Sequence, residues 1–200
     1  MTKYAIDKGM NVKPVPKVIF KNNEEKNSKD FLGKTAYYDP TNNSIVLFTL
    51  GRDPIAIEED FCAMLMKHIN HLDKMKELEN VISDVTEFMS SQGYTTSIPP
   101  KIKYIHDDPH NDSQDIIHIK SAYYNPSNKE IVLYTKNRHP RDIVSSYCHE
   151  YIHMVQDEEG RLNNISGENV LDSKELEEIE REAYENGGFM FRSFKDFMKK

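Results

Sequence analysis

Five consecutive residues, His149-Glu150-Tyr151-Ile152-His153, have the residue types and the spacing of a metal-assisted hydrolytic site. In a helix, residues four apart lie on the same face, so both imidazoles can reach one ion. Glu150 lies one step around the helix, where it can contact a water molecule held by that ion. The pattern predicts a catalytic Zn²⁺ with His149 and His153 as ligands and Glu150 as the general base.

A catalytic zinc needs a third protein ligand and an open position for water. The chain has no histidine after His153, so a third histidine would come from upstream. The candidates are His106, His110, His118 and His139. His139 begins the same predicted helix, and we expect it either to contact the site or the substrate, or to be a loop histidine without a role.

The acidic alternative lies in a predicted helix over about 172–195. Its apolar residues form one stripe at helical spacing, Leu176, Ile179, Ala183, Gly187, Met190 and Phe194. Glu180 lies on the edge of this stripe, whereas Glu178 and Glu182 point away from it. A carboxylate that faces the core needs a partner, and a zinc ion would be one. We therefore predict Glu180 as the third ligand, with Glu182 and Glu178 as the alternatives.

The chain contains two versions of one sequence pattern. Thr35-Ala36-Tyr37-Tyr38-Asp39-Pro40-Thr41-Asn42 recurs as Ser121-Ala122-Tyr123-Tyr124-Asn125-Pro126-Ser127-Asn128, an offset of 86 residues from Ala36 to Ala122. The same offset relates Ile45-Val46-Leu47-Phe48-Thr49 to Ile131-Val132-Leu133-Tyr134-Thr135. We interpret this repeat as an internal duplication, with copies over residues 1–92 and 93–200.

The first copy lacks every residue of the predicted metal site. When the copies are aligned, His149 lies opposite Ala63, Glu150 opposite Met64 and His153 opposite Lys67. Glu180 lies opposite Ile82. We expect this degenerate copy to act as a structural partner, with substrate selection as the alternative role.

Each copy is predicted to be a small antiparallel sheet with two helices, which makes the fold α+β. The expected strands are at about 17–20 and 101–106, at the Tyr-Tyr segments, and at about 45–50 and 130–136. Helices are expected to begin at Pro54 and Pro140, the second of them closed by Gly160, and further helices to span about 74–90 and 172–195. Either the Tyr-Tyr strand around 121–124 or the strand over 130–135 could serve as an edge to which a peptide adds, although the recurrence of the Tyr-Tyr pair in the site-less copy favours sheet packing for these tyrosines.

The motif, followed by Glu180-Arg181-Glu182-Ala183-Tyr184 on a later helix, resembles the gluzincin group of zincin metallopeptidases over roughly residues 100–190. In that group the downstream pattern is E-x-x-A-D/N or E-x-x-x-D, and its first glutamate is the third ligand, which the resemblance places at Glu180. The group often has Asp or Asn where this chain has Tyr184. The chain also resembles small duplicated zincin-like proteins of tailed phages.

This resemblance implies zinc-dependent hydrolysis of a peptide bond in a protein or peptide substrate. Candidates for stabilising the tetrahedral oxyanion are Tyr184, Tyr151, His139 and Arg138, among which the sequence does not choose. Asp157, one turn beyond His153, is expected either to orient that histidine or to end the helix. The alternative function is a catalytically inactive binding protein on the zincin scaffold, or a virion or assembly protein.

Composition is consistent with these expectations. The chain has 200 residues, of which 38% are hydrophobic and 30% charged, as is typical of a folded protein. A net charge of −7 argues against a nucleic-acid partner, and no apolar run approaches the roughly 18 residues of a membrane helix. With two cysteines and no signal-peptide pattern, we expect a cytoplasmic protein, in the host cytoplasm if the chain is viral.

Overall fold

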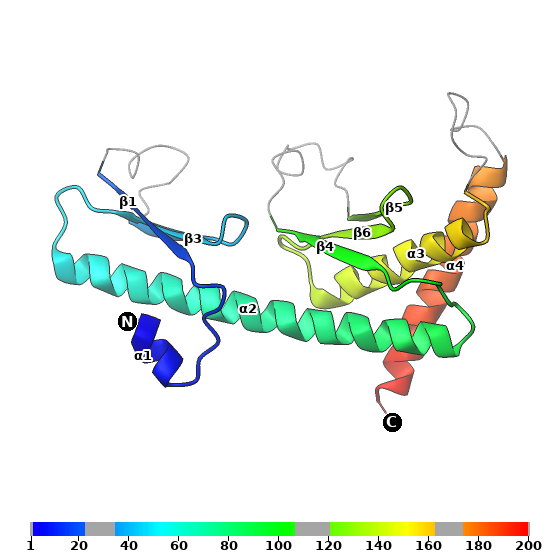
Figure 1. Ribbon diagram of the computed structural model, residues 1–200, viewed down its shortest axis with the longest axis horizontal. Coiled ribbons are helices and arrows are strands. Elements are labelled where there is room, and N and C mark those ends of the chain that lie inside the picture. Colours follow the sequence, from blue (N-terminus) through cyan, green and yellow to red (C-terminus); the bar gives the residue numbers. More distant parts are fainter. Residues whose placement is uncertain (1, 23–34, 107–120, 163–173, 200) are drawn as a thin grey trace. The chain divides into compact units, whose positions relative to one another are not determined.

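The computed structural model describes residues 2–22, 35–106, 121–162 and 174–199, and its fold is α+β, as the sequence predicts (Figure 1). The elements in chain order are α1 (Thr2–Asp7), β1 (Lys17–Lys21), β2 (Ala36–Asp39), β3 (Ser44–Phe48), α2 (Pro54–Ser91), β4 (Lys101–Ile105), β5 (Ala122–Asn125), β6 (Glu130–Tyr134), α3 (Pro140–Glu158) and α4 (Lys174–Phe197). None of the helices in these described ranges is both long enough and apolar enough to cross a membrane.

The chain forms two compact units, Met1–Glu77 and Leu78–Lys200, which divide within α2. Each unit contains one three-stranded sheet, in the order β1-β3-β2 in the first and β4-β6-β5 in the second. The predicted division into copies over 1–92 and 93–200 rests on the sequence repeat and stays a prediction.

In the first unit the central strand β3 is buried along its whole length. Two of its residues, Ile45 and Leu47, belong to a core with Val12 and with three residues of α2, Met64, Leu65 and Ile69. The N-terminal half of α2 therefore covers this sheet with an apolar face.

In the second unit the central strand is β6, whose residues Ile131, Val132 and Leu133 are fully buried. α3 packs on β5 and β6, and α4 packs on α3. This arrangement leaves β5 at an edge of its sheet, next to α3.

The two sheets have the same register, as the sequence repeat predicts. Ala36 pairs with Leu47 in the first sheet, and the aligned Ala122 pairs with Leu133 in the second. A set of hydrogen bonds from a half-buried arginine to backbone carbonyls also recurs. Arg138 donates from Nη1 to the carbonyl oxygens of Ser121 and Tyr134, at 2.7 and 3.0 Å, and Arg52 makes the two aligned bonds in the first unit.

The predicted antiparallel sheets are wrong, because both sheets are mixed. β2 runs antiparallel to β3, but β1 runs parallel to β3, and the second sheet repeats this pattern. Parallel neighbours need a crossover of a dozen residues or more. The long segment between β1 and β3 provides one, and the sequence pattern of three short strands does not reveal the direction of the first.

The predicted break between two helices of the first copy is also wrong, because α2 is continuous over 38 residues. After Pro54 its sequence contains neither glycine nor proline, so nothing in it stops the helix. In the second copy the break is present and was predicted correctly. Gly160 follows the C-cap residue Glu159 with a φ of 78°, a left-handed conformation that favours glycine.

Candidate metal centre

The helix that carries the motif begins at a capped N-terminus. Pro140 is in its first turn, and the side chain of His139 accepts a hydrogen bond from the Arg141 backbone N–H at 3.2 Å. His139 therefore acts as the N-cap of α3. It precedes His149 by about 15 Å along the helix axis, and the structure does not bring it to the motif.

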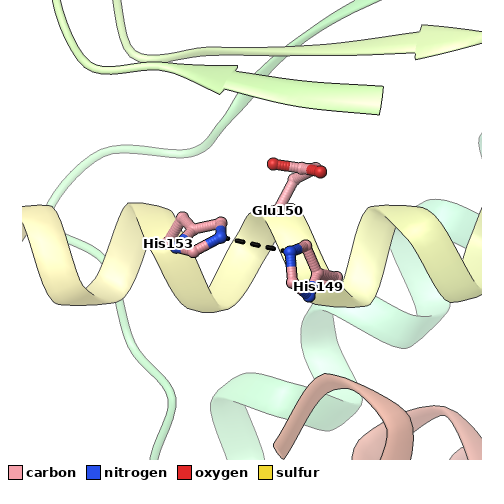
Figure 2. A group of neighbouring side chains, drawn as sticks. All are labelled: His149, Glu150 and His153. Carbon is pink, nitrogen blue, oxygen red and sulfur yellow. Dashed lines mark hydrogen bonds between the residues drawn. The ribbon is translucent and has the colours of Figure 1, made fainter. Parts of the chain in front are cut away.

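The two motif histidines and Glu180 converge on one point. The Nε2 atoms of His149 and His153 are 3.1 Å apart, with the rings edge to face. The Glu180 carboxylate, from α4, places Oε2 at 3.6 Å from the Nε2 of His149 and Oε1 at 3.5 Å from the Nε2 of His153. The structure thus brings together the three side chains that the sequence predicts as ligands. Figure 2 shows the two histidines side by side on α3.

These separations match those of ligands on a tetrahedral zinc. Ligand atoms at about 2.0–2.2 Å from one such ion lie about 3.3–3.6 Å from one another. The two Nε2 atoms are 3.1 Å apart, and each of them has a different Glu180 oxygen at 3.6 or 3.5 Å, so each pair agrees with this range to within about 0.2 Å. Two imidazoles and one carboxylate are also a donor set that zinc hydrolases use. The residues present therefore fit a zinc ion.

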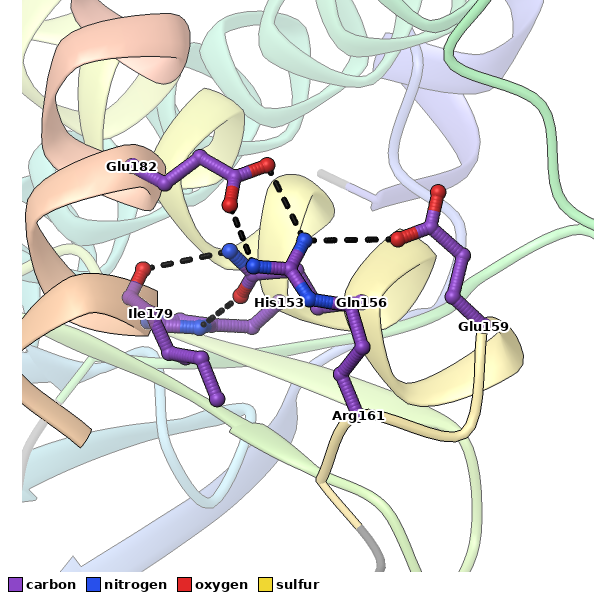
Figure 3. A network of polar contacts seen from close by, with 6 residues as sticks. All are labelled: His153, Gln156, Glu159, Arg161, Ile179 and Glu182. Carbon is purple, nitrogen blue, oxygen red and sulfur yellow. Dashed lines mark hydrogen bonds and ion pairs between the residues drawn. The ribbon is translucent and has the colours of Figure 1, made fainter. Parts of the chain in front are cut away.

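The ring orientation of His153 is fixed by Gln156 (Figure 3). The amide nitrogen of Gln156 donates to the carbonyl oxygen of Ile179 at 3.1 Å, so its amide oxygen faces the Nδ1 of His153 at 2.9 Å. Nδ1 must then be the protonated nitrogen, which leaves the lone pair on Nε2. This tautomer directs a metal-binding lone pair at His149 and Glu180.

Replacing Gln156 should therefore weaken zinc binding. Gln156→Leu leaves the Nδ1 of His153 and the Ile179 carbonyl without their partner, and we expect the zinc affinity to fall about 10- to 100-fold. Gln156→Glu can still accept from Nδ1 and should recover part of that loss. Competition titration with a chromophoric chelator measures both variants. A folded Gln156→Leu variant with wild-type zinc affinity would contradict this role.

His149 is held neutral by its surroundings. Burial lowers its pKa, as does the proximity of His153, while Glu180 and a hydrogen bond to the Ala183 backbone act in the opposite direction. Because the Nε2 of His149 faces His153, the hydrogen bond to the Ala183 backbone is made by the Nδ1 of His149. Both histidines therefore present unprotonated Nε2 atoms to each other, and a cation between them would remove that repulsion.

Glu150 is buried, with 8% of its surface exposed, and its carboxylate projects from α3 toward the sheet (Figure 2). Burial raises its pKa to about 7, against the effect of a hydrogen bond from the Tyr124 backbone of β5. The ligand atoms of Glu150, His149 and His153 lie within 4.8 Å of one another, so Glu150 could itself be taken for a ligand. Glu180 fits the third ligand position better than Glu150, because its two oxygens each face one Nε2 whereas Glu150 faces a backbone N–H.

A cleft of about 880 Å³ opens beside these side chains. Its walls come from β5, α3 and α4, and include Tyr123, Glu150 and Tyr184. Tyr184 is 78% exposed, and its ring lies 6.4 Å from that of His149. Of the four predicted oxyanion candidates, Tyr184 is the one that lines the cleft.

Two other oxyanion candidates have structural roles. Tyr151 is buried, and its hydroxyl donates to the carbonyl oxygen of Tyr94 at 3.2 Å. The Arg138 guanidinium donates to the carbonyl oxygens of Tyr134, at the end of β6, and Asp142, in the first turn of α3, and to the Ser146 hydroxyl at 2.7 Å. Neither side chain is free to contact a bound substrate.

The alternative acidic ligands do not reach the histidines. Glu182 forms a two-bond pair with Arg161, which lowers the pKa of the Glu182 carboxyl, and Glu178 is exposed. Asp157 accepts from the Tyr124 hydroxyl at 2.6 Å and from Lys129, so Gln156, and not Asp157, orients His153.

Among the upstream histidines, His106 contacts Thr135, with 3.2 Å between its Nδ1 and the Thr135 Oγ1. His110 and His118 lie outside the described residues.

Sequence reasoning missed two residues of this centre. Gln156 is one turn beyond His153, and its amide at an inward position was the available signal. Gly187 was seen only as part of an apolar stripe. A Cβ at this position would lie 2.9 Å from both the Cα and the backbone nitrogen of His149, so α4 touches the α3 backbone here.

Comparisons of the chain with protein-family models, with curated proteins and with solved structures give no match. The chemistry of the site therefore rests on its own residues.

Proposed function

We propose that this chain is a zinc-dependent peptidase whose metal is held by His149, His153 and Glu180. The observation that carries the proposal is the set of separations among two Nε2 atoms and one carboxylate, 3.1, 3.5 and 3.6 Å, which suits one tetrahedral ion. When bound, zinc lowers the pKa of a coordinated water and polarises a carbonyl group. In this proposal the second unit is a zincin-like unit of the gluzincin type, duplicated in degenerate form in the first unit.

Glu150 serves as the general base. Its carboxylate takes a proton from the attacking water and then delivers it to the leaving amine. The hydrogen bond from the Tyr124 backbone supports this role, since it holds the carboxylate beside β5 and next to the cleft. A base whose position is fixed loses little freedom when the substrate binds.

The free edge of β5 offers a place for an extended peptide. The backbone N–H of Tyr134 donates to the Ser121 carbonyl, and bonding alternates along an antiparallel pair. The backbone groups of Ala122 and Tyr124 therefore point to the side away from β6. The Tyr124 N–H already donates to Glu150, so the N–H and carbonyl of Ala122 and the carbonyl of Tyr124 are the groups left for a substrate strand. A substrate strand that adds there lies along the cleft, beside Glu150. Tyr184, exposed on the α4 wall of the same cleft, can donate its hydroxyl to the developing oxyanion.

Hydrolysis of unfolded casein by the full chain tests the proposal. Metal-free protein, prepared with a chelator, should be inactive, and one equivalent of Zn²⁺ should restore cleavage. Zinc binding without cleavage of any protein or peptide would instead favour a non-enzymatic binding protein on this scaffold. Absence of zinc binding would refute the metal centre altogether.

A further inference from the structure

The cleft-facing side of α4 has a composition of its own. Glu180, Tyr184, Gly188 and Arg192 follow one another at intervals of one turn, and all four line the cleft. These four residues do not belong to the apolar stripe of α4, whose buried residues form the face that packs on α3. The set of four begins at the proposed metal ligand and ends at an arginine, with Phe191 beside that arginine.

Arg192 is the only lysine or arginine among the described residues that line the cleft. A Cβ at Gly188 would lie 3.3 Å from its Nη1, so the guanidinium folds back over Gly188, toward the metal centre. In the part of the chain that the structure describes, no carboxylate pairs with it. Asp196, one turn further on, pairs with Lys199 at 3.2 Å. Among the described residues, Arg192 thus carries a positive charge that no carboxylate pairs with, and it presents this charge to whatever occupies the cleft.

The distance from the proposed metal ligand Glu180 to this charge can be converted into a number of residues of an extended substrate peptide. Gly188 is about 12 Å beyond Glu180 along the axis of α4. An extended peptide advances about 3.3 Å per residue, so this distance corresponds to three or four residues. Tyr184 lines the wall in between and Phe191 lines it next to Arg192, and both rings suit apolar side chains.

We propose that Arg192 binds a carboxylate of the substrate, three or four residues from the bond that is cut, with apolar residues between them. This inference rests on the proposed peptidase function. A planar guanidinium matches a carboxylate with two parallel hydrogen bonds. The carboxylate comes from an Asp or Glu side chain or from the C-terminus of the peptide, and the experiment distinguishes these two sources.

The test uses quenched-fluorescence peptides and the zinc-loaded full chain. In one series of apolar peptides, each peptide carries a single Asp, and its position varies over the four residues on either side of the cut bond. A matched peptide carries the neutral Asn at the same position. A second series ends at those distances with a free carboxylate or an amide. We expect kcat/KM to rise about five- to tenfold for the charged member at three or four residues from the cut.

The variants assign this preference to Arg192. Arg192→Gln should abolish it, and Arg192→Glu should favour a Lys at the same position. Arg181→Gln is the matched control, because Arg181 is exposed on the same helix and does not line the cleft. It should retain the wild-type preference. The series that shows the preference identifies the source of the carboxylate.

Equal cleavage of charged and neutral peptides by the wild type, unchanged in Arg192→Gln, would overturn the inference and leave the peptidase function standing. If the zinc-loaded wild type cuts none of the peptides, and fluorescence anisotropy detects no binding of them, the proposed function and the inference are both refuted. A preference that persists in Arg192→Gln would assign the carboxylate to another residue.

Discussion

Glu150→Gln is expected to retain the zinc and to lose peptide cleavage by a factor of about 10²–10⁴. The amide keeps the size of the side chain and can still accept the hydrogen bond from the Tyr124 backbone that the carboxylate accepts. It has no basic oxygen to take a proton from water. Since Glu150 is not one of the three proposed ligands, zinc affinity should stay within about twofold of the wild type. Casein hydrolysis and chelator competition measure the two quantities.

Glu178→Gln is the control for this substitution. Glu178 is exposed on α4 and is absent from the cleft wall, so the same change of charge should leave cleavage and zinc affinity unaltered. Cleavage by Glu150→Gln at the wild-type rate would contradict the assignment of the base. Loss of zinc from Glu150→Gln would identify Glu150 as a ligand.

Gly187→Ala is expected to destabilise the protein by about 1–3 kcal/mol and to weaken zinc binding about 10- to 100-fold. The new Cβ would lie 2.9 Å from the backbone of His149, which cannot rotate away as a side chain could. α4 must therefore move away from α3. Glu180 lies two turns earlier on nearly the same side of α4, so its carboxylate moves away from the two imidazoles. Thermal unfolding of the metal-free chain and zinc titration measure both effects.

The neighbouring glycine provides the matched control. A Cβ at Gly188 would meet only the Arg192 Nη1, at 3.3 Å, and this flexible side chain can move. Gly188→Ala should then show the ordinary benefit of alanine in a helix, a gain of about 0.5–1 kcal/mol, with zinc affinity unchanged. Opposite signs for adjacent glycines are hard to obtain from helix propensity alone. Gains in stability at both positions would contradict the close packing of α4 on α3 at Gly187.

The side chains of the candidate site were predictable because they depend on helical periodicity. The spacing from His149 to His153 fixes a common face, and Glu180 was selected because it borders the apolar stripe of its own helix. The structure brings these three side chains together, and their binding of zinc remains the proposal to be tested. The α+β class was predictable because each copy of the repeat contains short strand patterns followed by helix patterns.

Features that depend on contacts between elements were not predictable. The direction of β1 relative to β3 depends on the path of a long connection, which the local pattern does not encode. Gln156 becomes important only because α4 brings the Ile179 carbonyl to its amide. His139 was expected either to contact the site or the substrate or to be a loop histidine without a role, and its capping of α3 depends on local backbone geometry.

Anomalous diffraction at the zinc edge, from crystals of the zinc-loaded chain, tests the metal centre most directly. We predict one strong peak about 2.0–2.2 Å from the Nε2 atoms of His149 and His153 and from the carboxylate of Glu180, with a fourth position open to water. A zinc peak held by other residues, or no peak between these side chains in protein saturated with zinc, would contradict the account.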